Sequence, residues 1–251
     1  MNRETVMSYI NIFAVLKNME ELVIVDNESA ELIKGKNITI QFIVKNGPRA
    51  ALMFKDGKAE LKSGKHRSHI TLFFTSPNHF NKMMDGDANP IPLKGFTKIG
   101  FLTGAFMKLA ERLEFYLRAD AELLKKPEIY KANTEMTAYA AFFALSEIAN
   151  NDELGIHNAA GIPDGIIQVK VENGPAIMLH KNGGRLTTEK GLTEDPRCIL
   201  SFRSMDAAHQ VLNGKLDTYT AIATGEMEMR GFIPMIENMN PILDMVAEYL
   251  A

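Results

Sequence analysis

The 251-residue sequence contains one cysteine, Cys198, and no tryptophan. A single cysteine excludes the internal disulfide framework of small secreted domains and favours a reducing, intracellular setting. No apolar run approaches the length that a membrane-spanning helix requires. The N-terminal residues combine early charges with a periodic apolar face, which is typical of an amphipathic helix and not of a signal peptide. We therefore expect a cytoplasmic protein.

Sequence signatures of catalysis are also missing. There is no G-x-S-x-G, H-E-x-x-H, P-loop or C-x-x-C pattern. Cys198 lies in the apolar stretch RCILSF and is interpreted as a core residue, while His66 and His69 have no carboxylate pattern near them and are interpreted as a solvated pair. The sequence predicts no catalytic residue, no metal site and no cofactor, so we expect a protein that is not an enzyme.

The charge is unevenly distributed along the chain. Residues 1–125 carry 18 Lys and Arg against 14 Asp and Glu, and the remainder carries 10 against 17, which sums to a net charge of −3. Drift between two copies of one unit would explain this, and so would attraction between the halves or a peripheral contact of the basic first half with a membrane surface. Nothing is basic enough to indicate a nucleic-acid partner.

The dominant pattern is an internal repeat. Residues 40–48 read IQFIVKNGP and residues 167–175 read IQVKVENGP, an offset of 127. At an offset of 128, the pattern Leu72-x-Phe74-x-Ser76 returns as Leu200-x-Phe202-x-Ser204. Such a spacing is too long for a solenoid repeat and has the length of a domain. We predict two copies of one fold, at residues 1–120 and 133–251, joined by a linker at 121–132.

Hydrophobic periodicity and turn residues predict the same elements in each copy. A helix (4–19 and 134–148) precedes four strands, of which the middle two are joined by D-G or N-G-G hairpin signals. A serine-capped helix follows, and then a fifth strand that a glycine introduces: Gly95 precedes 96–101, and Gly225, which matches Gly95 at an offset of 130, opens 225–230. An apolar closing helix ends each copy. We predict an α+β fold with a five-stranded, mostly antiparallel sheet covered by helices in each copy.

Methionine is abundant, with 15 residues. Several of them fall where the last strand and the closing helix would meet. Two interpretations stay open: they are ordinary core residues, or they line an apolar ligand cavity between the sheet and the helices, because methionine adapts to varied apolar partners.

Taken together, these stretches resemble the sterol carrier protein type 2 family. In the first copy the resemblance lies in ALMFKDGKAELKSG, LFFTSPNHFNKMMDG and LKGFTKIG, and in the second it lies in IMLHKNGGRL, LSFRSMDAAHQVLNGK and ATGEMEMRG. The resemblance covers nearly the whole chain, twice. It implies a five-stranded sheet covered on one side by helices, with a hydrophobic tunnel between them.

The resemblance implies non-catalytic binding or transfer of a lipid such as a fatty acid, an acyl-CoA or a sterol-like molecule. Its tunnel positions correspond to apolar residues of the short helix, the last strand and the closing helix: Phe80, Met83, Met84, Ile99, Phe101, Phe106, Leu109, Leu113, Leu212, Met227, Met229, Phe232, Met235, Ile236, Met239 and Leu243. The alternatives are an interaction module with a filled core that docks a lipid-metabolism enzyme, and an enzyme acting on acyl thioesters. The oligomeric state is not predicted.

Overall fold

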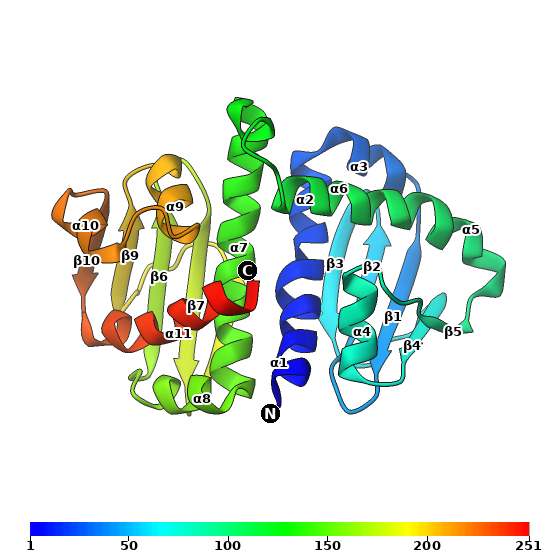
Figure 1. The fold of residues 1–251 in the computed structure, drawn as a ribbon, viewed down its shortest axis with the longest axis horizontal. Helices are drawn as coiled ribbons and strands as arrows, with labels where there is room; N and C mark the ends of the chain where they lie inside the picture. Colours follow the sequence, from blue (N-terminus) through cyan, green and yellow to red (C-terminus); the bar gives the residue numbers. More distant parts are fainter. Residues whose placement is uncertain (251) are drawn as a thin grey trace. The chain divides into compact units, whose positions relative to one another are not determined.

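The computed structural model describes residues 1–250 (Figure 1). The chain divides into two compact units, a first unit of residues 2–123 and a second unit that runs from residue 124 onward and includes Met1. The linker expected at 121–132 coincides with η5 (Leu123–Lys125) and with the first turns of α7, which begins at Pro127.

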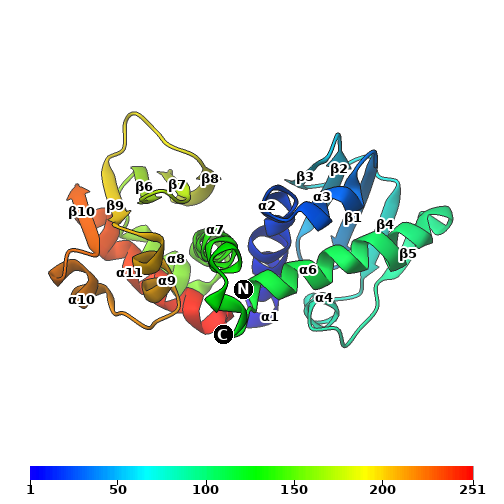
Figure 2. The ribbon, with the colours of Figure 1, turned by 90° about the horizontal axis from the view of Figure 1, so that it is seen from above.

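The first unit opens with a helical run and closes with another. Its elements are α1 (Arg3–Ile10), η1 (Asn11–Val15), η2 (Leu16–Asn18), α2 (Met19–Val25), α3 (Asn27–Ile33), β1 (Ile38–Val44), β2 (Arg49–Lys55), β3 (Lys58–Ser63), β4 (Ile70–Phe74), α4 (Pro77–Met84), β5 (Ile91–Lys94), η3 (Phe96–Lys98), α5 (Ile99–Phe101), η4 (Leu102–Phe106) and α6 (Met107–Leu117). Helices α4 and α6 lie on one face of its sheet (Figures 1 and 2).

The second unit repeats this plan. Its elements are α7 (Pro127–Asn151), α8 (Glu153–Ala160), β6 (Gly165–Val171), β7 (Ala176–Asn182), β8 (Arg185–Lys190), β9 (Cys198–Phe202), α9 (Met205–Leu212), α10 (Thr218–Ala223), β10 (Met227–Gly231) and α11 (Pro234–Leu250). Its helices lie on one face of the sheet, and the connection from β8 to β9 crosses the other face (Figure 2).

Both sheets have the same strand order. The first is β3-β2-β1-β4-β5 and the second, read from the matching edge, is β8-β7-β6-β9-β10. All pairs are antiparallel except the central ones, β1 with β4 and β6 with β9. The predicted α+β fold, with two mostly antiparallel five-stranded sheets, is confirmed. The parallel pair was not predicted, because hairpin signals report only local, antiparallel connections.

The predicted hairpin turn and the two predicted serine caps are present in the structure. Asp56 and Gly57 both have positive φ, at 53° and 73°, as the two-residue turn of a tight hairpin requires. The hydroxyl of Ser76 accepts from the His79 N–H at the start of α4, and that of Ser204 accepts from the Ala207 N–H at the start of α9. These caps satisfy N–H groups that have no partner within the helix.

The fifth strand of the first unit was predicted wrongly. Residues 96–101 are helical, and the strand is β5, which precedes Gly95. Ile99 and Phe101, two predicted tunnel residues of the last strand, therefore lie on α5. The apolar residues Phe96, Ile99 and Phe106 recur at helical spacings, and the segment runs directly into α6.

The structural equivalent of Gly95 is Gly231, not Gly225. Gly95 follows β5 directly and Gly231 is the last residue of β10, and their φ angles are 97° and 88°. A Cβ at Gly95 would lie 2.8 Å from the His69 carbonyl oxygen, and one at Gly231 would lie 2.5 Å from that of Arg197. Only glycine fits this close approach of the chain to the neighbouring strand.

A buried glutamine fixes the crossover of each sheet. In the first unit the Gln41 side-chain amide donates to the carbonyls of Ala50 (2.9 Å) and Gly64 (3.1 Å), and its oxygen accepts from the His66 N–H (2.8 Å). Gly64 and His66 belong to the chain that leaves the edge strand β3 and crosses to β4. The amide therefore ties this connection to β1.

The second unit repeats the same bonds with Gln168. Its amide donates to the carbonyls of Ile177 (3.0 Å) and Gly191 (3.1 Å), and its oxygen accepts from the Thr193 N–H (2.9 Å). Both glutamines are buried. A buried backbone group without a hydrogen-bond partner is costly. In a crossover helix these groups would pair with one another, whereas here the glutamine amides are their partners.

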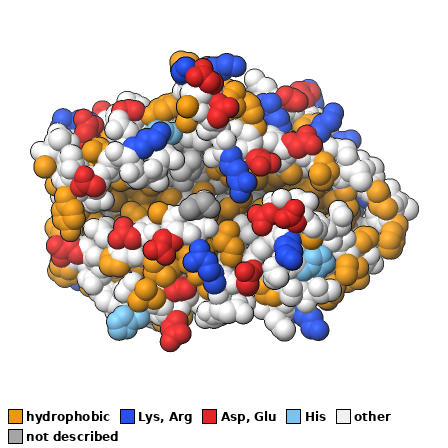
Figure 3. Space-filling model, viewed as in Figure 1, with side chains coloured by type: hydrophobic (Ala, Val, Ile, Leu, Met, Phe, Trp, Pro, Cys, Tyr) orange, Lys and Arg blue, Asp and Glu red, His pale blue; other side chains and the backbone are white. Residues whose placement is uncertain are grey.

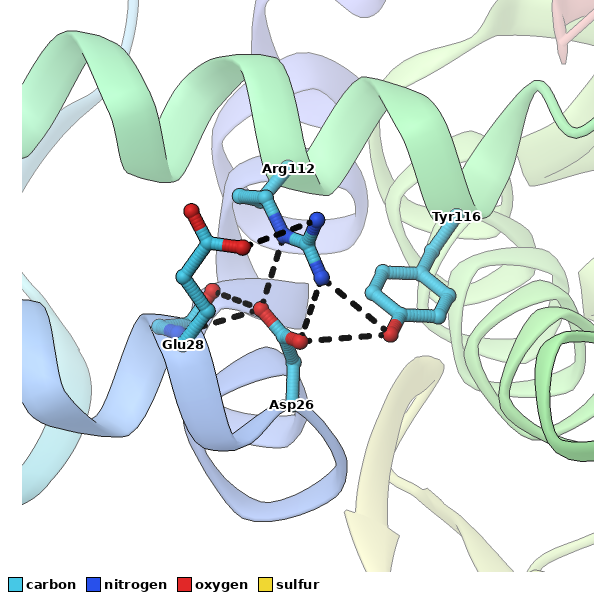
Figure 4. Close-up of polar contacts among 5 residues, drawn as sticks. Asp26, Glu28, Arg112 and Tyr116 are labelled. Atoms are coloured by element: carbon cyan, nitrogen blue, oxygen red, sulfur yellow. Dashed lines mark hydrogen bonds and ion pairs between the residues drawn. The ribbon is translucent and has the colours of Figure 1, made fainter.

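A partly buried ion pair holds the closing helix of the first unit (Figure 4). Asp26 caps α3, and its carboxylate accepts from Arg112 Nε (2.9 Å) and from the Tyr116 hydroxyl (3.3 Å) on α6. Arg112 also lies 3.2 Å from Glu28. Burial by itself raises the pKa of Asp26, but hydrogen bonds from Arg112 and Ser29 outweigh it, so this pKa lies below its ordinary value. The cluster anchors α6 to the junction of α2 and α3.

Replacing Gln168 by Leu should lower the free energy of unfolding by about 3 kcal/mol, because buried backbone groups of the crossover lose their partners. Urea unfolding of the full chain measures this, and hydrogen exchange of the Thr193 amide should accelerate. Gln210→Leu is the matched control, since Gln210 bonds only an exposed carboxylate, and we expect a change within about 0.5 kcal/mol. Equal unfolding midpoints for the two variants would contradict the role of Gln168.

Replacing Asp26 by Asn keeps a good capping residue but removes the charge, and should lower the unfolding free energy by about 2 kcal/mol at neutral pH. Because the folded pKa is depressed, the carboxylate's contribution is full above the unfolded pKa of about 3.9 and is lost as pH falls through the folded value. The difference between variant and parent should therefore shrink in urea titrations below about pH 4. Glu60→Gln, at an exposed pair, is the control, and a pH-independent difference would refute the assignment.

Candidate functional site

The second unit contains a pocket of about 920 Å³ along its edge strand β10. It is lined by residues in or next to β6, β9, β10 and α10, and by Ile233, which directly precedes α11. Its apolar lining consists of Ile199, Phe202, Ile222, Met227, Met229 and Ile233. Its polar lining consists of Lys170, Glu172, Ser201, Arg203, Glu228 and Arg230.

Strand register explains the polar side of the pocket. Lys170 pairs with Ser201 across the parallel ladder, and Ser201 pairs with Glu228 across the antiparallel one, so the three form one row across the sheet. Ser201 alternates with the buried residues Leu200 and Phe202. The row therefore lies on the face of the sheet that points away from the helices.

The next row of the same face mixes apolar and charged groups. Ile199 pairs with Arg230, and Arg230 Nε lies 2.8 Å from Glu228 Oε1. This surface ion pair contributes little to stability, but it places a guanidinium and a carboxylate at the border of the apolar lining. Met227 and Met229 alternate with Glu228 and Arg230, so the lining combines apolar side chains of the helix-covered face with charged side chains of the outward face around the edge strand β10. Such a combination suits an amphipathic molecule.

The predicted tunnel residues of the second unit are divided. Met227 and Met229 line the pocket. Met235, Ile236 and Met239 on α11 are at most 1% exposed, which leaves no surface for a ligand in the described conformation. The remaining three keep some exposed surface and do not line the pocket; they are Leu212, Phe232 and Leu243.

The predicted tunnel residues of the first unit are divided in the same way. Phe80 and Leu109 are fully buried and Leu113 is nearly so. Met83, Met84, Ile99, Phe101 and Phe106 keep exposed surface. The Phe101 ring contacts Phe54 of the sheet (centroids 5.7 Å apart), and the Phe106 ring contacts Phe42 (6.4 Å). The structure brings these aromatic side chains together between helix and sheet.

Sequence reasoning missed the outward-facing side of the pocket. It did not single out Lys170, Ile199 or Ser201. One signal was available: Ile199 is a large apolar residue at an outward position of a strand that alternates, where a polar side chain is expected. The contribution of Ile222 could not be read from the sequence, because it depends on how α10 folds back toward β10.

A second polar cluster, away from this pocket, joins α7 to α9. The Tyr130 hydroxyl donates to Asp206 (2.6 Å), and the Thr134 hydroxyl lies 3.2 Å from Nδ1 of the buried His209. Burial, helped by the charge of Lys215, lowers the pKa of His209. A neutral imidazole in contact with helix partners serves to link the helices.

The Cys198 thiol and the possible metal ligands were compared with the requirements of a reactive site. Burial, partly offset by Arg197, raises the pKa of the Cys198 thiol to about 11, so this thiol stays protonated at neutral pH and is a poor nucleophile. Among residues 1–250, no three His, Cys, Asp or Glu side chains group as metal ligands. No helix in the same residues has both the length and the hydropathy needed to cross a bilayer.

The sequence matches no protein-family model and no curated protein. Among solved structures, it is similar to the sterol carrier protein domain 2 of Helicoverpa armigera, with a TM-score of 0.37 and 18% identity over 45% of this chain and 89% of that one. It is also similar to sterol carrier protein 2 from Yarrowia lipolytica in its apo form, with a TM-score of 0.35 and 20% identity over 43% of this chain and 90% of that one.

A different type of protein is also similar. The inverting sec-alkylsulfatase Pisa1 from Pseudomonas sp. gives a TM-score of 0.28 and 14% identity over 63% of this chain and 29% of that one. All these TM-scores are below 0.5 and say nothing about ligand or activity. The sterol carrier similarities each involve somewhat less than half of this chain.

Proposed function

We propose that the protein binds and transfers an amphipathic lipid, such as a fatty acid, an acyl-CoA or a sterol-like molecule, without chemical conversion. The observation that carries this proposal is the pocket beside β10, whose lining combines apolar side chains with charged ones. Its volume of about 920 Å³ lies in the range of small-molecule sites. Nine of the predicted tunnel residues keep exposed surface, and two of these, Met83 and Met84, belong to the short helix α4 of the first unit.

The physical basis would be the removal of a lipid tail from water. Each buried methylene contributes roughly 0.8 kcal/mol, and the flexible side chains of Met227 and Met229 can adapt to different tails. The head group would lie at the charged side. There Lys170, Arg203 and Arg230 supply three positive charges against the two carboxylates of the lining, so a singly or doubly anionic head is favoured.

Non-catalytic action in the cytoplasm belongs to the same proposal. It is supported by the presence of a single, unpaired cysteine, which is typical of proteins from a reducing compartment. The names of the similar solved structures describe carriers, and that description is extended to this chain only as a proposal.

One observation favours a second candidate, an interaction module that docks another protein. Phe80, Leu109, Met235 and Met239, which a sheet–helix tunnel should expose, are all fully buried. Side chains fill the space at these positions. In this reading the pocket beside β10 is a recess of the docking surface.

The first measurement is mass spectrometry of an organic-solvent extract of the purified full-length chain. A stoichiometric fatty acid, phospholipid or acyl-CoA is expected. Ser201→Trp should reduce the bound lipid and weaken fluorescent fatty-acid binding at least tenfold, because the indole occupies the polar row beside Ile199. Thr187→Trp, at an exposed position of β8 in the same sheet, is the matched control and should bind as the parent does.

Since the native chain has no tryptophan, either variant also reports its own folding by fluorescence. A clean extract together with no fatty-acid binding by the parent would reject the carrier proposal and favour the interaction module. Undiminished binding by Ser201→Trp would show that the lipid lies outside the pocket beside β10.

A further inference from the structure

The first unit ends in a helical segment that is poorly covered. No residue from 82 to 108 is buried, although the stretch includes β5 and the helical run from η3 to η4. Burial resumes at Leu109 on α6, whose continuation is anchored by the ion pair of Arg112 with Asp26. The helical run is therefore fixed at one end and open to solvent along one side.

Large apolar side chains occupy that open side. Phe96 is 63% exposed, Ile99 44% and Met107 51%, and Leu93 at the end of β5 is 56% exposed. We call Leu93, Phe96, Ile99 and Met107 the overhang surface. Hydrophobic side chains gather on the part of the first unit where α5 and β5 lie (Figure 3). An exposed set of this kind is typical of a contact site.

Three lysines are interspersed along the chain with the residues of the overhang surface. Residues 88–110 contain Lys94, Lys98 and Lys108 and no Asp or Glu. Lys98 and Lys108 lie on the same helical run as Phe96, Ile99 and Met107, and Lys94 follows Leu93 directly. The nearest carboxylates along the chain are Asp87 and Glu111, just outside this stretch.

From this combination we infer that the overhang surface docks the first unit onto an anionic lipid bilayer. Protruding apolar side chains enter the boundary between head groups and acyl chains, and lysines beside them are attracted by anionic lipids. A protein interface of this apolar character would be expected to carry a mixed polar rim, whereas here every charged residue of the segment is cationic. The surface belongs to the first unit and the proposed lipid pocket to the second, so the inference goes beyond the proposed function.

Sedimentation with vesicles tests the inference. The full-length chain should sediment with vesicles of phosphatidylcholine and phosphatidylserine, less with pure phosphatidylcholine, and less as salt rises. The double variant Lys98→Glu with Lys108→Glu should weaken the partitioning at least 25-fold, since each lysine near the surface contributes about fivefold. Lys36→Glu with Lys58→Glu, both exposed in the same unit, changes the net charge equally and should have a much smaller effect.

The apolar part is tested by Phe96→Ser with Ile99→Ser, which should abolish sedimentation while leaving the melting temperature unchanged, because both side chains are exposed. Leu192→Ser, at a residue 69% exposed in the second unit, is its control. Ser201→Trp should sediment like the parent, which separates failure of the docking from failure of the pocket. Absence of parent sedimentation with either vesicle, or equal losses in the overhang and control variants, would overturn the inference.

Discussion

One buried side-chain amide in each sheet, that of Gln41 or Gln168, holds the crossover segment on which the arrangement of the unit depends. The central strands run parallel, so the chain must cross from the edge strand over the sheet, and it does so without a helix of its own. Gln41 and Gln168 satisfy the backbone of that crossing chain from within the sheet. With the crossing segment held on one face, the helices collect on the other, and the outward row of Lys170 and Ser201 is left beside it.

The two units differ at the connection that leads to the last strand. In the first unit, α4 is followed closely by β5, and the chain then continues as a long helical run. In the second unit, α10 is inserted between α9 and β10, and Ile222 of α10 becomes part of the pocket lining. The pocket of the second unit thus uses a helix before the last strand that the first unit lacks, whereas the overhang surface of the first unit lies mainly on the helical run after β5.

Much of the fold could be read from the sequence, but less of the site. The repeat, the Asp56-Gly57 turn and the Ser76 and Ser204 caps are local signals with direct structural causes. The fifth strand was misplaced because Gly95 was aligned with Gly225 by spacing, while the close approach to a neighbouring strand that makes Gly95 equivalent to Gly231 is a tertiary contact. Pocket residues such as Ser201 could not be predicted, because their position depends on the register of three strands that are distant in the sequence.

The parallel pairing has a consequence for how each unit folds. Ile40 pairs with Ile70, and Ile167 with Cys198, so the sheet centre joins residues separated by a complete hairpin. Closing such a loop costs chain entropy before its contacts are gained, whereas the hairpins between β2 and β3 and between β7 and β8 close locally. The hairpin is therefore expected to form before β4 or β9 joins the sheet.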